Sequence, residues 1–129
     1  MKINYIILHC SDSDNPKHDN IETIRDWHLD RGFKDIGYQY LITKNGGIFI
    51  GRKEFESGAH CKGFNKESIG ICLTGRDNFS NQQFDSLSLL VENLCYRYNL
   101  DYSKVLPHNH FNKAKTCPNF PMGRLTNLL

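Results

Sequence analysis

The sequence has no stretch that approaches the roughly 20 consecutive apolar residues that a membrane-spanning helix requires. Its N-terminal apolar run, Tyr5 to Leu8, is short and leads directly into His9 and a polar segment. A secretory signal peptide would need a longer apolar centre followed by a cleavage site of small residues. We therefore expect a protein that is synthesised in the cytoplasm without a signal peptide and has no role within a membrane.

A strong excess of charge of either sign is also missing. The formal net charge is +2, and the 16 lysine and arginine residues are spread along the chain among 14 acidic residues. A nucleic-acid-binding face needs its basic residues clustered, so no nucleic acid partner is expected. A chain of 129 residues is long enough for one compact domain and too short for two. We expect a single domain, 1–129, that acts as a monomer.

The cysteines do not show the pattern of a disulfide framework. There are five, an odd number, and their spacing is irregular. Reduced thiols are the simpler interpretation, and a reduced thiol is available to bind a metal ion. The five are Cys10, Cys61, Cys72, Cys95 and Cys117.

Short apolar runs alternate with helical patterns, which predicts an α/β fold with a central mixed β-sheet flanked by helices. Asn20 is suited to cap the first helix, and Ser80 with Gln83 gives a capping-box pattern at the start of the second. Asn45-Gly46 lies between two apolar runs and predicts a hairpin turn with positive φ at both residues. The first helix is expected over 21–31, and strands are expected over 5–9, 37–43, 48–50, 68–73 and 105–106.

The segment 108–117 has neither a helical nor a strand period and predicts a loop. It contains His108 and Cys117, and imidazole and thiolate are both preferred zinc ligands. A catalytic zinc site needs three protein ligands and one open position, so a third ligand must come from elsewhere. His9 is the best candidate, because it ends the first strand and ligands bind at the carboxyl ends of strands in open α/β sheets. Spacing alone does not require His9 and His108 to meet.

Six sequence blocks, in one order and over nearly the whole chain, together resemble a known family. They are His9-Cys10-Ser11, Ile24-Arg25-Asp26-Trp27-His28, Asp35-Ile36-Gly37-Tyr38, 58–65 (Gly-Ala-His-Cys-Lys-Gly-Phe-Asn), 68–73 (Ser-Ile-Gly-Ile-Cys-Leu) and His108 through Lys115-Thr116-Cys117-Pro118-Asn119-Phe120. The family is that of the zinc-dependent N-acetylmuramoyl-L-alanine amidases, and the sequence is most similar to the amidase-type lysozymes of phages. Peptidoglycan recognition proteins share the same fold.

The resemblance implies a reaction and a set of site residues. The reaction is hydrolysis of the amide between the lactyl group of N-acetylmuramic acid and the L-alanine of a peptidoglycan stem peptide, by zinc-activated water. By the same resemblance, one zinc ion per chain is bound by His9, His108 and Cys117. Tyr38 matches the family's active-site tyrosine and Lys115 its active-site lysine, and both are expected to assist catalysis.

Three further positions qualify this assignment. His60 matches a histidine of the family's substrate groove, so we expect it to bind substrate or to support a metal ligand, with an ordinary histidine of a surface loop as the alternative. Relatives that recycle muropeptides carry a glutamate base where this chain has Cys72, so no carboxylate base is available here. The interval before the last ligand varies in the family, which makes His110 a rival of His108. We prefer His108 because it directly follows the last expected strand.

Two other functions compete with the amidase. A non-catalytic peptidoglycan- or muropeptide-binding module is the main alternative, because many peptidoglycan recognition proteins have lost the cysteine ligand. The presence of Cys117, Tyr38 and Lys115 argues against it. A thiol hydrolase that uses Cys117 and His108 would need no metal, but it leaves His9 unexplained. A phage or prophage lysis enzyme and a toxin injected into neighbouring cells are equally compatible settings for action on the cell wall.

Overall fold

A computed structural model describes residues 2–128 of the chain. Its centre is a five-stranded mixed sheet with the strand order β3-β2-β4-β1-β5. All neighbouring strands are parallel except the hairpin of β2 and β3. The strands are β1 (Tyr5–Cys10), β2 (Tyr40–Ile42), β3 (Ile48–Ile50), β4 (Ser68–Leu73) and β5 (Val105–Pro107). The helices are α1 (Ile21–Asp30), α2 (Asn81–Tyr98) and α3 (His108–Phe111), with 3₁₀ turns at Pro16–His18, Asn65–Glu67, Tyr102–Lys104 and Met122–Leu128. The α/β prediction is confirmed.

The two central strands, β1 and β4, are the most deeply buried part of the sheet. Every residue of β4 is buried, and so are the last five residues of β1. Parallel strands covered on both faces read as continuous apolar runs, which explains the isoleucine-rich sequence of both strands. The register pairs Leu8 with Ile71 and His9 with Cys72, so the polar His9 enters an otherwise apolar layer.

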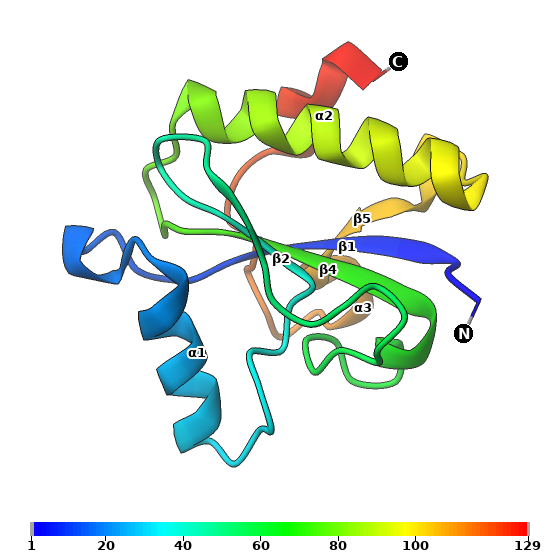
Figure 1. The fold of residues 1–129 in the computed structure, drawn as a ribbon. Helices are drawn as coiled ribbons and strands as arrows, with labels where there is room; N and C mark the ends of the chain where they lie inside the picture. The colour runs from blue at the N-terminus through cyan, green and yellow to red at the C-terminus, as the bar shows by residue number, and fades with distance from the viewer. Residues whose placement is uncertain (1, 129) are drawn as a thin grey trace.

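One face of the sheet is covered by α2. Ser80 caps this helix in a complete capping box with Gln83, as expected from the sequence. The apolar stripe of the helix, at a 3.6-residue spacing, packs with alternate strand residues into the larger core cluster. Figure 1 shows α2 and the C-terminal turn on one side of the sheet, with α1 and α3 on the other.

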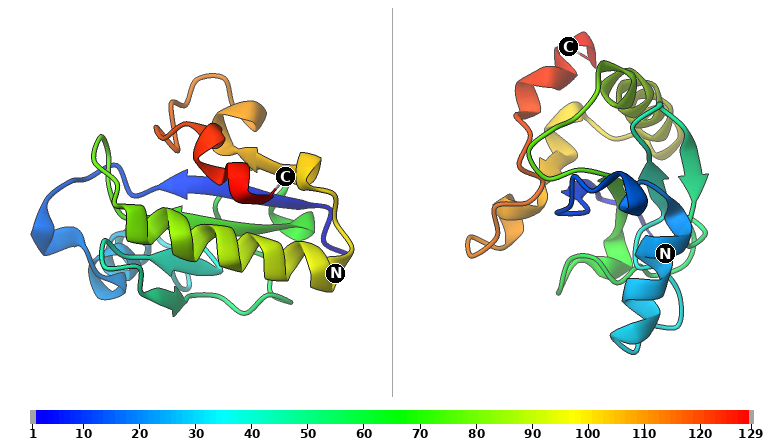
Figure 2. Two further views of the ribbon diagram at one scale, coloured as in Figure 1. Left: turned by 90° about the horizontal axis from the view of Figure 1, so that it is seen from above. Right: turned by 90° about the vertical axis from the view of Figure 1, so that its left-hand side faces the viewer.

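The opposite face is covered only in part. Asn20 caps α1 through the backbone N–H of Thr23, and the helix buries Ile21 and Ile24 against Leu41 and other residues of the sheet. Because α1 is short, it covers only part of this face, and loops and α3 complete the layer (Figure 2). The described part of the chain contains no helix long and apolar enough to cross a membrane.

Three local expectations differ from the structure. The strand expected over 37–43 is shorter, β2 (Tyr40–Ile42), and before it the backbone N–H of Gly37 donates to Nδ1 of His28 in α1. The hairpin forms, but Gly46 is its only residue with positive φ, at 85°. The expected loop 108–117 begins with one helical turn, α3, closed by the Asn112 N–H on the His108 carbonyl.

Replacing Gln83 should destabilise the fold, because its buried amide joins α2 to two strand ends. Its Nε2 donates to the carbonyls of Ile42 (3.1 Å) and Thr74 (2.8 Å). Gln83→Ala would leave these carbonyls buried without this partner, and we expect a loss of about 2–4 kcal/mol in the free energy of unfolding. Urea denaturation measures it. The matched control Gln82→Ala, at an exposed neighbour, should stay within about 0.5 kcal/mol of wild type. Equal losses in the two variants would contradict the assignment.

Candidate active site

Three side chains from distant parts of the sequence meet on the incompletely covered face of the sheet. They are His9 of β1, His108 at the start of α3, and Cys117. One ligand atom from each lies within 4.8 Å of the others. In this cluster the Nδ1 atom of His9 lies 3.9 Å from the sulfur of Cys117. The structure therefore brings together the three residues that the sequence could not place relative to one another.

The position of His108 follows from strand pairing. Strand β5 pairs in parallel with β1, and Pro107 at its end lies opposite Leu8. The next residues of the two strands are His108 and His9, and their ring centroids are 4.5 Å apart. Cys117 is held close to His108, because the backbone N–H of the next residue, Asn109, donates to the Cys117 carbonyl at 3.0 Å. His110 is exposed and lies outside the cluster.

The imidazoles of the cluster are held in the neutral form. Burial lowers the pKa of His9 well below its usual value, and the neighbouring His60, His108 and His28 lower it further. Burial also lowers the pKa of His108, and the Lys115 ammonium adds to this effect. Neutral imidazole is the form that binds a metal ion, so these histidines need not lose a proton at neutral pH.

The donor set fits a zinc ion. Two imidazole nitrogens and one sulfur are a known catalytic zinc combination, and tetrahedral coordination puts such atoms about 3.3–3.8 Å apart. The observed separations therefore need only a small contraction. The backbone N–H of Cys10 donates to the Cys117 sulfur at 3.1 Å, which favours a thiolate. A hydrogen bond with the Cys10 side chain and burial raise the pKa of the Cys117 thiol, and a bound cation would favour its ionised form.

Tyr38 lies beside the cluster, between two histidine rings. Its ring centroid is 5.0 Å from that of His9 and 5.3 Å from that of His28. The backbone next to Tyr38 is fixed, because the Gly37 N–H donates to His28 Nδ1 at 2.7 Å. Burial, followed by the nearby Cys72 and Cys117, raises the pKa of the Tyr38 hydroxyl well above its ordinary value. Tyr38 is therefore a hydrogen-bond donor in this site.

The remaining predicted residues, Lys115 and His60, differ in their surroundings. Both line the same cleft as the cluster. Lys115 is exposed in the segment between α3 and Cys117. His60 instead lies behind His9: its Nδ1 is 2.8 Å from His9 Nε2, and its Nε2 is 3.2 Å from the Ser68 hydroxyl. Both ring nitrogens of His60 thus already have partners within the protein.

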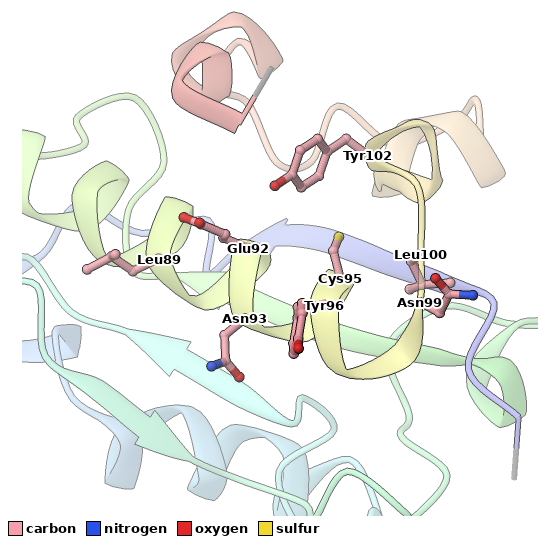
Figure 3. A pocket seen from close by; sticks show the side chains of 8 residues that line it. All are labelled: Leu89, Glu92, Asn93, Cys95, Tyr96, Asn99, Leu100 and Tyr102. Carbon is pink, nitrogen blue, oxygen red and sulfur yellow. The ribbon is translucent and has the colours of Figure 1, made fainter.

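A second hollow lies along the C-terminal half of α2 and the turn that follows it (Figure 3). Its eight lining residues include one carboxylate, Glu92, and no histidine. Burial, followed by the charge of Asp101, raises the pKa of its Cys95 thiol to about 11, so this cysteine is unreactive at neutral pH. The hollow lacks the paired functional groups of the cleft around His9.

Sequence reasoning missed two supporting features of the site. His28 was assigned no role from the sequence, whereas its buried ring accepts the Gly37 N–H and so holds the backbone before Tyr38. The sequence indicates Gly70 only as part of the strand expected over 68–73. A Cβ atom built on it would lie 2.6 Å from the His60 ring, so glycine leaves the space that this ring occupies. The only sequence signal for Gly70 was a glycine inside a strand, which can mark close approach of another group.

Comparison with known proteins identifies relatives over almost the whole chain. The family described as N-acetylmuramoyl-L-alanine amidase matches residues 1–120. The endolysins of Enterobacteria phage T3 and Escherichia phage T7 are each 35% identical to this chain, over 92% of it and 82% of their own length. The N-acetylmuramoyl-L-alanine amidase LysC from Clostridium intestinale superposes with a TM-score of 0.88 at 30% identity, covering 98% of this chain and 85% of that one. Drosophila peptidoglycan recognition protein PGRP-LB gives 0.77 at 30% identity, with 96% and 77% covered.

The buried His28 should make the stability of the metal-free protein sensitive to acid. Burial, followed by Arg31 and Arg52, lowers the pKa of His28 to about 4 in the folded state, against an ordinary value near 6.5. As the pH falls below 6.5, the unfolded chain takes up this proton and the folded chain does not, so stability is lost down to about pH 4. Between pH 7 and pH 5, the free energy of unfolding of the wild type should fall by on the order of 1–2 kcal/mol more than that of His28→Gln. Urea denaturation with a chelator present measures this difference. An equal fall in both proteins would contradict it.

Proposed function

Because the chain belongs to the N-acetylmuramoyl-L-alanine amidase family, we propose that it uses one bound zinc ion to hydrolyse the amide between N-acetylmuramic acid and L-alanine in peptidoglycan. The prediction of an amidase is confirmed by the family match and by the endolysin relatives. The zinc ion and the roles of individual residues are what this proposal adds.

One observation carries the proposal. His9, His108 and Cys117 converge in one cleft, and Tyr38 and Lys115 line the same cleft. These residues come from three separate parts of the chain: β1, the stretch before β2, and the segment 108–117. Burial against a covered sheet face does not require two histidines and a thiol to share one point, whereas coordination of a metal ion does.

His9, His108 and Cys117 would bind the zinc ion. At a site with three protein ligands and one open position, zinc activates water at neutral pH and polarises a carbonyl group. The protein contributes neutral imidazoles and a sulfur that accepts a backbone hydrogen bond. Residues 59–62, Asn65 and α1 contribute to the walls of the cleft in which the stem peptide would lie.

Tyr38 and Lys115 would stabilise the charge that develops on the amide oxygen during attack. The Tyr38 hydroxyl stays protonated, so it can donate a hydrogen bond to that oxygen. The Lys115 ammonium lies on the exposed side of the cleft, where it can approach the same oxygen. The strand position expected for a glutamate base is instead the buried thiol of Cys72, whose pKa is raised by burial first and then by Cys10, so the proposal assigns no base to this strand.

The substrate would be met at the cell wall after release from the cell, as for a phage endolysin, and the protein would act as a monomer. The endolysin relatives support the first part of this proposal. A peptidoglycan-binding module without catalysis is the second candidate function, and the likeness to peptidoglycan recognition proteins supports it.

The reaction is tested by incubating the purified protein with peptidoglycan, with and without a zinc chelator. We expect new L-alanine amino ends without new sugar reducing ends, loss of this release with the chelator, and its return when zinc is added. Retention of the protein on peptidoglycan without any release would support the binding module instead. Release that survives complete removal of metal would overturn the zinc mechanism.

Loss of either assisting group should slow hydrolysis while leaving the metal site intact. For Tyr38→Phe and for Lys115→Met we expect a fall in kcat of about 100-fold, the usual effect of removing one donor to a developing oxyanion. Zinc content should stay at one ion per chain in both variants. Lys113→Met is the matched control, because Lys113 is an exposed lysine of the same segment that does not line the cleft. A similar loss in Lys113→Met would mean that general positive charge, and not Lys115 itself, is responsible.

A further inference from the structure

A hydrogen-bond network connects Ser68 of strand β4 with the candidate metal site. The hydroxyl of Ser68, the first residue of β4, lies 2.8 Å from the Phe64 carbonyl and 3.2 Å from Nε2 of His60. On the other side of the His60 ring, Nδ1 lies 2.8 Å from Nε2 of His9. The remaining nitrogen of His9, Nδ1, faces Cys117.

The outermost partner, the Phe64 carbonyl, fixes the direction of every hydrogen bond in this network. A carbonyl oxygen can only accept, so the Ser68 hydroxyl donates its hydrogen to Phe64. The Ser68 oxygen is then the acceptor for an N–H on Nε2 of His60. In a neutral imidazole this leaves a lone pair on His60 Nδ1, which accepts from an N–H on His9 Nε2.

The hydrogen-bond network therefore ends in a lone pair on Nδ1 of His9, the atom that faces Cys117. We propose that His60, held by Ser68, is a positioning residue that fixes His9 in the tautomer able to bind a metal ion through Nδ1. The inference rests on the metal site of the proposed function. Of the two roles expected for His60 from the sequence, it selects support of a metal ligand and not substrate contact.

The ring of His60 is closely packed between two glycines. Cβ atoms built on Gly58 and Gly70 would lie 2.6 Å from this ring, so the backbones at both glycines are in close contact with it. The backbone of His60 is also held, because the Asn65 side-chain oxygen accepts from the N–H groups of His60 and Cys61, each at 2.9 Å. A ring fixed in this way can orient the ring of His9 in turn.

Zinc affinity tests the inference through a matched pair of variants. Asn and Leu have nearly the same shape, but the Asn side-chain oxygen can replace His60 Nδ1 as an acceptor and Leu cannot. His60→Leu should lower zinc affinity by about 10- to 100-fold, as does the loss of other groups that hydrogen-bond a metal-binding histidine. His60→Asn should remain close to wild type. Competition with a chromogenic chelator measures each dissociation constant on folded protein.

Ser68→Ala tests the Ser68 end of the hydrogen-bond network without changing a residue that lines the cleft. It removes the acceptor of His60 Nε2–H, so zinc affinity should fall here too. The control is Ser86→Ala, since Ser86 likewise donates to one backbone carbonyl, that of Gly46, but on α2. In metal-free wild-type protein, long-range ¹H–¹⁵N spectra should show His9 with its hydrogen on Nε2, and Ser68→Ala should shift part of the population to Nδ1.

The outcomes separate this inference from the amidase proposal. Wild-type zinc affinity in His60→Leu together with reduced hydrolysis would make His60 a substrate contact and overturn the inference, while the amidase would stand. Equal weakening in His60→Asn and His60→Leu would indicate packing alone and would also overturn it. A wild-type protein that binds no zinc would overturn the metal site itself, and this inference with it.

Discussion

The parallel pairing of β5 with β1 is the interaction on which the rest of the site depends. Because Pro107 lies opposite Leu8, the next residue of each strand is a histidine, and the two rings meet. A register shift of one residue would send one of these side chains to the other face of the sheet. Val105 of β5 is buried in the same core cluster as Ile6 and Leu8 of β1, which makes such a shift unfavourable, so the core that stabilises the fold also sets the geometry of the cleft.

The two faces of the sheet differ in how they are packed and in which side chains they carry. One face is packed against the long helix α2 and carries most of the apolar core. The other has the short helix α1, and next to it His9, Tyr38 and His60 occupy space that apolar side chains would otherwise fill. Burial there keeps the histidines neutral and the tyrosine protonated. The same low polarity that makes these groups costly to bury thus prepares them to bind a cation and to donate a hydrogen bond.

Several residues around the cleft support other residues and would not themselves touch zinc or substrate. His28 holds the backbone before Tyr38, and Ser68 and His60 stand behind His9. Gly70 has no side chain, and this leaves the space that the His60 ring occupies. Changes at such positions would alter the site without removing any of its reactive atoms, which is why they are as informative to vary as the expected ligands.

The α/β class, the capped starts of α1 and α2, and the hairpin at Asn45-Gly46 could all be predicted from the sequence, because periodicity, capping and turn preferences are local. The resemblance to the amidases also identified the residues that gather in the cleft. That His9 meets His108 and not His110 could be seen only in the folded chain, since it depends on strand register and on the helical turn of α3. The same holds for the surroundings of His60, because the contacts with His9, Ser68 and Gly70 join segments that have no local relation in the sequence.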